Sequence, residues 1–453
     1  MRNTPKISAP RLVAFSAPAF ITSILHGPIN GILPGIYAKD FGLSLGVIGT
    51  ILMISRLFDA ATDPLIGYLS DHTRSRFGRR KPWMFLGSCL LLFGAYKLFV
   101  PPENVGVVYF TVWFMLFYLF MTMMDIPYSA WQVELSRDYH QRTRIITYRQ
   151  IFMIVGSIAF GAIPLLPFLP TSEFTPQVMK YVAWIIIIIL PPLTILPLWL
   201  VAEPKDISTK ESTSLKELYS SVIHNKPFVH LATCFLLNGL AGGLFGSIGF
   251  LFFDTYLLIG GSYTYIMIST SVIILVAMPF WLNMMKRFNK HKVWAVGSFI
   301  GALFFPAIFF IEPGPNAFIL MLVIYTGAMA FYASGMVGPM SMLGDVIDYD
   351  TLKSGISRSA QYYSFWQLVM KTNAAIGGGV GFLILGLFKY DATAKVHTAT
   401  EIIGIKLTAG AIPMILFLIV AILAWFFPID RHRQAIIKKR IESLSERASI
   451  LNK

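Results

Sequence analysis

Long apolar runs constrain this chain more than any other feature of its sequence. A helix needs roughly 20 apolar residues to cross a hydrocarbon layer about 30 Å thick. Twelve such runs follow one another, near residues 12–38, 45–69, 82–100, 105–131, 146–168, 179–201, 228–257, 263–285, 293–311, 316–343, 360–388 and 402–427. Hydrophobic residues make up 55% of the chain and charged residues 13%, which is not the composition of a water-soluble protein. The sequence therefore predicts an all-α integral membrane protein with twelve transmembrane helices.

A polar, Ser/Thr-rich stretch near the middle of the chain divides the runs into two groups of six. We expect an N-terminal six-helix bundle at 1–202, a central loop at 203–227, a C-terminal six-helix bundle at 228–428 and a tail at 429–453. Apolar residues recur in the tail at helical spacing among basic ones, which predicts an amphipathic helix on an anionic membrane surface; they are Ile436, Ile437, Ile441 and Leu444. Two equal groups suggest an internal repeat.

The ends of two runs show a weak sequence similarity that would fit an internal repeat. The fourth run closes on the segment from Pro127 to Glu134, and the tenth closes on the segment from Pro339 to Asp345. Proline, serine and then an acid occur in the same order in both, and a basic loop follows each. This similarity favours two related halves.

The 37 Lys and Arg residues are distributed very unevenly between the two sides of the membrane. Placing both termini on one side puts 29 of them there, six on the other side, and two inside the apolar runs. Because cytoplasmic loops carry the excess of Lys and Arg, we expect both termini to be cytoplasmic. The first run is too long for a signal-peptide core, so we expect it to stay as an anchor. Topology accounts for the pI of 9.6 without a nucleic-acid partner.

Five ionisable residues lie inside apolar runs, where each is a functional hypothesis by default. Arg56, Asp59 and Asp63 are spaced i, i+3, i+7 in the second run and share one helical face. Asp125 lies in the fourth run and Lys371 in the middle of the eleventh. We expect all five to face a central cavity. Asp254 lies near the outer end of its run, where an interfacial position is expected.

The five charges sum to minus one, so a monovalent cation would neutralise them. Hard cations such as Na⁺ prefer oxygen ligands, and two threonines supply oxygens beside the acids: Thr62 next to Asp63, and Thr122 one turn before Asp125. Protonation of one carboxylate would serve equally. The residues leave Na⁺ and H⁺ both open. The structural alternative is that Arg56 and Lys371 only hold helices together through salt bridges.

Other function classes lack their signatures. The sequence contains no G-x-x-x-x-G-K-[ST] loop, no H-E-x-x-H and no grouping of Cys and His, so neither a membrane enzyme nor a primary pump is indicated. Cys89 and Cys234 are far apart inside apolar runs, and we expect both to be buried. Gly377 to Gly379 in the eleventh run fit bending and close helix packing equally well.

One long string carries a family resemblance. The segment from Asp59 to Trp83 reads DAATDPLIGYLSDHTRSRFGRRKPW, and three further stretches agree with it: Asp125 to Ser129, Asp138 to Arg144, and Gly344 to Asp350 followed by Lys371. With these motifs the chain resembles the glycoside–pentoside–hexuronide:cation symporter branch of the major facilitator superfamily. The resemblance covers nearly the whole chain. It implies a monomer in the bacterial inner membrane, alternating access, and sugar uptake coupled to Na⁺, Li⁺ or H⁺ without a prosthetic cofactor.

The resemblance also implies roles for particular residues. A cation site between the second and fourth helices would use Asp59, Thr62, Asp63, Thr122 and Asp125. Asp125 would adjoin the substrate and Lys371 would couple the two sites. Charges that latch the halves at a cytoplasmic gate would come from Arg56, Asp71, Arg79, Arg80, Arg142 and Asp345.

The galactoside site of the family's melibiose permease is not kept residue for residue. That protein has an acid in its first helix, whereas this chain has none before Asp40. Aromatic faces can stack on sugar rings and planar polar groups can bind hydroxyls, so we expect a sugar site that uses Tyr128, Trp131, Arg149, Trp366 and Gln367. Arg149 would also suit an acidic sugar. The alternative cargo is a lysolipid or organic anion, which predicts an apolar cavity.

Overall fold

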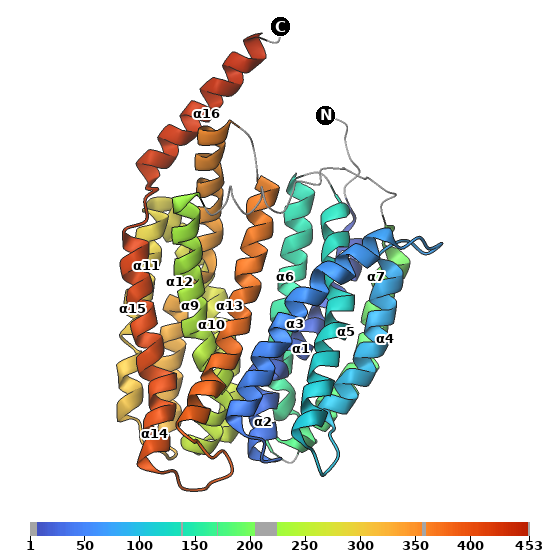
Figure 1. Ribbon diagram of the computed structural model, residues 1–453, viewed down its shortest axis with the longest axis vertical. Helices are drawn as coiled ribbons and strands as arrows, with labels where there is room; N and C mark the ends of the chain where they lie inside the picture. The colour runs from blue at the N-terminus through green and yellow to red at the C-terminus, as the bar shows by residue number, and fades with distance from the viewer. Residues whose placement is uncertain (1–6, 137–138, 170, 204–223, 356–358, 452–453) are drawn as a thin grey trace. The chain divides into compact units, whose positions relative to one another are not determined.

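The structure is a computed structural model that describes residues 7–136, 139–169, 171–203, 224–355 and 359–451. Every regular element in these residues is helical (Figure 1). Backbone N–H and C=O groups have no water to bond in a hydrocarbon layer, so each spanning segment must satisfy them internally, and a helix does so. Within the described residues, eleven helices are long and apolar enough to cross a membrane, and the described part of the eleventh predicted run adds the shorter apolar helix Ile376–Leu387. The multi-pass prediction is confirmed.

Contacts divide the chain into two compact units. Unit 1 comprises Met1–Thr209, Ser247–Ser271 and Gly378–Ile402, and unit 2 comprises Lys210–Gly246, Val272–Gly377 and Ile403–Lys453. The sequence predicts a different division, into two six-helix halves that follow one another along the chain. The contact-based units do not test it, and it stays a prediction.

Unit 1 contains the first six spans. Its helices are α1 (Ala9–Gly27), η1 (Pro28–Ile32), α2 (Leu33–Lys39), α3 (Leu45–His72), α4 (Lys81–Phe99), α5 (Val107–Glu134), α6 (Tyr139–Ala162), η2 (Ile163–Leu165) and α7 (Pro176–Leu200). The first span is interrupted, because the π-helical segment η1 contains Gly31 in an extended conformation with φ 174°. Close packing also explains part of the glycine run: a Cβ on Gly379 would lie 3.0 Å from the Gly49 carbonyl oxygen of α3.

Four helices contribute to both units, and the rest belong to unit 2. The shared helices are α9 (Lys226–Leu251), α10 (Gly260–Arg287), α13 (Ser359–Leu387) and α14 (Ala399–Lys406), and η3 (Phe252–Tyr256) belongs to unit 1. Unit 2 holds α11 (Lys290–Ala302), η4 (Phe305–Phe310), α12 (Ala317–Ser354), η5 (Leu407–Ala411), α15 (Ile412–Trp425) and α16 (Arg431–Leu451). A Cβ on Gly377 would lie 2.8 Å from the Cα of Gly243, so this glycine also permits close helix contact.

Cys89 and two isoleucines of the tail lie differently from the expectation. Cys234 is buried as expected, but Cys89 is exposed on α4, where an apolar side chain can face lipid. Asp254 is buried, and its carboxylate accepts a hydrogen bond of 2.5 Å from Lys39 Nζ within unit 1. In the tail, Ile437 is buried in the core of unit 2 and Ile441 packs against that core. Part of the tail's apolar face therefore meets protein and not a membrane surface.

Candidate functional site

Two helices of unit 1 bring an acid and a hydroxyl together inside the membrane span. Thr122 on α5 donates a hydrogen bond of 2.6 Å from Oγ1 to Asp59 Oδ1 on α3. Thr62 is buried on α3 and donates to the Asp59 carbonyl at 3.2 Å. Asp63 lies one helical turn beyond Asp59, and Asp125 lies just under one turn beyond Thr122. The two helices therefore meet at Asp59 and Thr122, and Asp63 and Asp125 lie within about one helical turn of that contact along their own helices.

Prolines add acceptors on the same two helices. Pro64 lies inside α3 and Pro127 inside α5, and neither has a backbone N–H to donate. The carbonyls of Ala60 and Met123, four residues earlier, therefore lack their usual helical donors. Carboxylate, hydroxyl and carbonyl oxygens are the ligands that hard cations prefer.

Arg56 does not neutralise Asp59. Its Nη2 donates to Asn30 Oδ1 at 3.0 Å, in the η1 segment, and its Cζ lies 4.5 Å from the ring centroid of Tyr118. Among the described residues, Arg56 and Asp59 form no ion pair. The structural alternative, in which Arg56 exists to pair with this acid, therefore has no support at Asp59.

Asp125 faces a histidine of the first span. His26 Nε2 on α1 lies 3.6 Å from Asp125 Oδ2, and both side chains are partly exposed. The other oxygen, Oδ1, is buried and has no hydrogen-bond partner among the described residues. Because His26 stands alone in its apolar run, the sequence favours a packing role or a hydrogen bond to a ligand over a proton relay.

Arg149 on α6 forms hydrogen bonds with polar side chains of α5 that follow Asp125 along that helix. Nη1 donates to Gln132 Oε1 at 2.5 Å and to Ser129 Oγ at 3.2 Å. Its Cζ lies 4.4 Å from the ring centroid of Tyr128, a cation–π contact. Arg149 has no acidic partner among the described residues, so its positive charge is available to an anion.

The two aromatic candidates of α5 are fully buried. Tyr128 donates from its hydroxyl to the Phe15 carbonyl at 2.6 Å. Trp131 packs edge-on against Phe15, with ring centroids 5.3 Å apart, and Lys81 Nζ lies 5.4 Å from its ring centroid. Both rings have the surroundings of packing residues.

The remaining substrate candidates belong to α13 in unit 2. Trp366 is buried, with its ring centroid 4.7 Å from that of Phe235. The side chains of Gln367 and Lys371 lie outside the described residues, as does that of Arg142 in unit 1.

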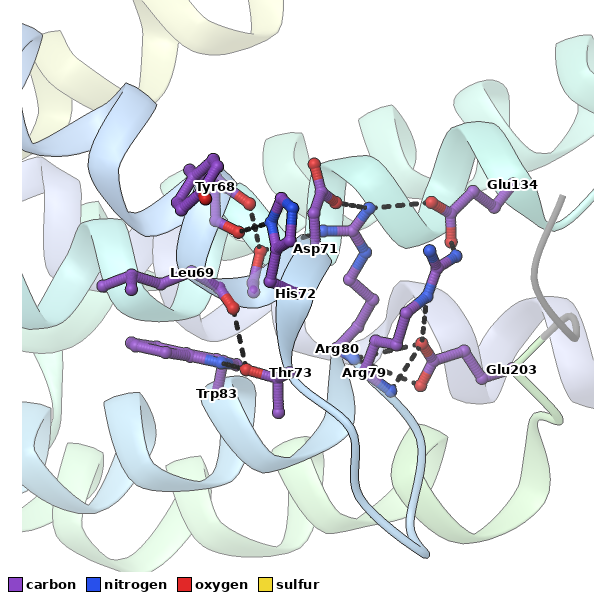
Figure 2. A network of polar contacts seen from close by, with 12 residues as sticks. Tyr68, Leu69, Asp71, His72, Thr73, Arg79, Arg80, Trp83, Glu134 and Glu203 are labelled. Atoms are coloured by element: carbon purple, nitrogen blue, oxygen red, sulfur yellow. Dashed lines mark hydrogen bonds and ion pairs between the residues drawn. The ribbon is translucent and has the colours of Figure 1, made fainter. Parts of the chain in front are cut away.

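A charge network joins the ends of four helices of unit 1 (Figure 2). Arg80 pairs with Asp71 at the end of α3, donates from Nη2 to Glu134 Oε1 of α5 at 2.8 Å, and donates from Nη1 to Ser70 Oγ at 2.9 Å. Arg79 Nη2 lies 3.4 Å from Glu134 Oε2. Burial alone would lower the pKa of Arg80, but the hydrogen bond and charge of Glu134 and the charge of Asp71 outweigh it and raise that pKa.

Glu203 completes this network and was not expected from the sequence. Its carboxylate accepts from the backbone N–H groups of Arg79 at 2.9 Å and Arg80 at 3.0 Å, at the start of α4. A carboxylate at a helix N-terminus is favourable. Gly78 has φ 112°, and a Cβ there would lie 2.1 Å from Glu203 Oε2, so the position requires glycine. The sequence signal was an acid directly after the sixth run.

Unit 2 contains a matching pair. Lys290 Nζ at the start of α11 lies 2.8 Å from Asp345 Oδ2 near the end of α12. Arg80 just before α4 and Glu134 at the end of α5 hold the same positions in the first half. In both places a cation at the start of one helix binds an acid on the following helix, Glu134 at the end of α5 and Asp345 in the second half of α12. The relation between the two halves stays a prediction.

Comparison with known proteins points to one family. Residues 14–431 match the family model described as MFS/sugar transport protein. An uncharacterised symporter of Bacillus subtilis is 24% identical over 97% of this chain and 96% of its own length. The sodium-dependent lysophosphatidylcholine symporter 1 of Gallus gallus is 24% identical over 88% of this chain and 82% of its length. A glucuronide carrier protein homolog of Escherichia coli is 24% identical over 87% of this chain and 86% of its own length.

Solved structures agree on the fold. A bacterial homolog of the human lysosomal transporter Spinster superposes with a TM-score of 0.67 at 12% identity, covering 96% of this chain and 99% of the other. At this identity the similarity concerns architecture alone.

Proposed function

The chain belongs to the MFS/sugar transport protein family, and we propose that it is a secondary active symporter that couples a monovalent cation to movement of a sugar or sugar derivative. The proposed cation is Na⁺, Li⁺ or H⁺. The proposed sequence of events is alternating access, with the two predicted six-helix halves exposing the site to each side of the membrane in turn. Both termini are proposed to be cytoplasmic, on the distribution of Lys and Arg.

The observation that carries the proposal is the 2.6 Å hydrogen bond between Thr122 and Asp59. It brings α3 and α5 together at an ionisable group, within a segment where a charge is costly unless it has a function. Asp59 forms no ion pair with Arg56 among the described residues, so a coupling cation can neutralise it. Thr122, Asp63 and the proline-freed carbonyls would supply further oxygens.

The neighbouring His26 and Asp125 connect cation and substrate in this proposal. Asp125 follows Thr122 on α5 and faces His26 at 3.6 Å. A sugar hydroxyl could bond to the unsatisfied Oδ1 of Asp125, while protonation of His26 would strengthen its attraction to Oδ2. Cation binding at Asp59 would remove a nearby negative charge, and this is the proposed physical basis of coupling.

Arg149 supports an acidic sugar as the cargo. Its guanidinium is always charged and binds carboxylates in a fork geometry. The chain retains no acid in the first span before Asp40, whereas it presents a cation on α6 without an acidic partner among the described residues. A hexuronide is therefore preferred over a neutral galactoside, in line with the relative named as a glucuronide carrier homolog.

A second candidate cargo is a lysophospholipid. A cavity of about 370 Å³ in unit 1 is lined by apolar side chains alone, those of Phe20, Ile151, Phe152, Val155, Ile189 and Leu193. An acyl chain fits such a lining, and Arg149 on the same helix as Ile151 could bind a phosphate. A relative named as a lysophosphatidylcholine symporter favours the same candidate.

A thermal-unfolding screen of the detergent-purified protein would test the proposal. Glucuronides, neutral glycosides, pentoses and lysophosphatidylcholine would each be added in Na⁺, Li⁺ or K⁺ and at two pH values. A ligand at about 100 times its Kd adds roughly 2.7 kcal/mol. Stabilisation by a sugar only in Na⁺ or Li⁺, or only at one pH, supports cation-coupled sugar symport. If lysophosphatidylcholine alone stabilises the protein, it replaces the sugar as the proposed cargo. If a ligand stabilises the protein equally in Na⁺, Li⁺ and K⁺ and at both pH values, the proposed cation coupling is overturned.

A further inference from the structure

A cavity in unit 2, away from the acids of α3 and α5, combines cationic and apolar walls. It has a volume of about 290 Å³ and lies between the end of α10, the start of α11, the second half of α12 and the start of α16. Its apolar wall consists of Leu282, Met285, Phe288, Met342 and Ile429. Its charged wall consists of Lys286, Lys290, Asp345, Asp430 and Arg431, with His291 beside them.

The partners of these charges decide which remain available. Lys290 is committed to Asp345, with Nζ 2.8 Å from Oδ2 and 3.0 Å from Oδ1. Asp430 Oδ1 accepts from the backbone N–H of Arg433 at 2.7 Å, which caps α16. Among the described residues, Arg431 donates to neutral groups: Nη1 to the Arg287 carbonyl at 3.0 Å and its backbone N–H to Asn289.

Lys286 is exposed and forms no ion pair with any residue that the structure describes. Asp345 is therefore paired with Lys290, whereas Asp430 accepts only from a neutral N–H, so the three cations of the cavity exceed its two carboxylates by one charge. The cavity offers a site for a negatively charged group.

The surroundings point to a lipid as the source of that group. Phe288 on one edge is 56% exposed. Trp425 and Phe426, four and three residues before the lining residue Ile429, are 46% and 73% exposed. Exposed aromatic side chains beside Lys and Arg mark the headgroup level of a membrane, and Lys292 Nζ lies 5.1 Å from the ring centroid of Trp425. Basic pockets between helices at this level bind anionic headgroups.

From this combination we infer that the cavity between α10, α11, α12 and α16 binds the phosphate group of an anionic phospholipid, with Lys286 and Arg431 as its cationic contacts. The first acyl carbons would lie along Leu282 and Phe288. The inference is independent of the transported substrate, because none of these residues belongs to the site on α3 and α5.

The experiment compares phospholipid with free phosphate on the delipidated full-length protein. Thermal unfolding would be followed as phosphatidylglycerol, phosphatidylcholine or inorganic phosphate is added, for wild type, Lys286→Gln and the control Lys439→Gln. Lys439 is also exposed, carries the same charge on α16 and does not line the cavity. Lys286 has no described acidic partner, so its variant should fold as wild type does.

Phosphatidylglycerol is expected to stabilise wild type and the control, and its half-saturating concentration should rise about fivefold in Lys286→Gln, the effect of one charge at a membrane surface. The same pattern with inorganic phosphate would support the phosphate site with a free anion as its source. Phosphatidylcholine equal to phosphatidylglycerol, or identical curves for Lys286→Gln and Lys439→Gln, would overturn the inference.

Discussion

Replacing Thr122 with valine removes the hydroxyl that bonds Asp59 and keeps the shape of the side chain. Thr122 Oγ1 lies 2.6 Å from Asp59 Oδ1, the short distance of a bond to a charged acceptor. Such bonds contribute about 1.5–3 kcal/mol, and every 1.4 kcal/mol is a factor of ten in affinity. If Thr122 orients Asp59 or binds the cation itself, the variant should weaken cation binding by about 10- to 150-fold.

The assay is the melting temperature of the purified protein as a function of Na⁺, Li⁺ or H⁺ concentration. The matched control is Thr111→Val on the same helix, which removes an exposed hydroxyl that bonds only the Val107 carbonyl at 2.8 Å. The control should titrate as wild type does. An unchanged midpoint for all three cations in Thr122→Val would refute the assignment of this site.

Three further predictions follow from other contacts. Gly78→Ala should lower the free energy of unfolding by about 1–3 kcal/mol, because φ is 112° there; an unchanged melting temperature would contradict it. Asp430→Ala should reduce the stability of α16 by about 1 kcal/mol through loss of its N-terminal cap, whereas Asp430→Asn should reduce it less. Proteolysis of α16 should therefore be faster in Asp430→Ala than in Asp430→Asn. The Arg433 backbone N–H lowers the pKa of Asp430, so this contribution should be complete above about pH 4 and fall at lower pH. His26→Gln removes the imidazole that lies 3.6 Å from Asp125 and should weaken substrate binding, and an unchanged substrate affinity would remove His26 from the proposed coupling to Asp125.

The extent of the helices could be predicted from hydropathy, but their interruptions could not. Most predicted ends lie within a few residues of the structure because the length of an apolar run follows from membrane thickness. Hydropathy ends the tenth run at 343, whereas α12 continues to Ser354 and is closed by Gly355 with φ 74°. The extension includes Asp345, Asp348 and Asp350, since helical hydrogen bonding does not require apolar side chains. The segment η1 begins at Pro28 and contains Gly31, residue types that weaken a helix, but their presence does not specify that the backbone becomes π-helical there.

The candidate site could be predicted as a set of residues but not as a set of contacts. Helical spacing placed Asp59 and Asp63 on one face. The spacing did not indicate that Thr122 would bond to Asp59 or that Arg56 would bond to Asn30. Such pairings depend on how neighbouring helices are rotated, which tertiary packing decides. Glu203 illustrates the same limit, because its partners Arg79 and Arg80 lie more than 120 residues away in sequence.

The most direct test of the central claim is uptake into proteoliposomes of the ligand that the unfolding screen identifies. An inwardly directed gradient of the coupling cation should drive accumulation of that ligand above its external concentration in wild type. Asp59→Asn should bind the ligand but fail to accumulate it, because the proposed cation site has lost its charge. Accumulation that is the same with and without the cation gradient, or that survives in Asp59→Asn, would contradict cation-coupled symport through Asp59.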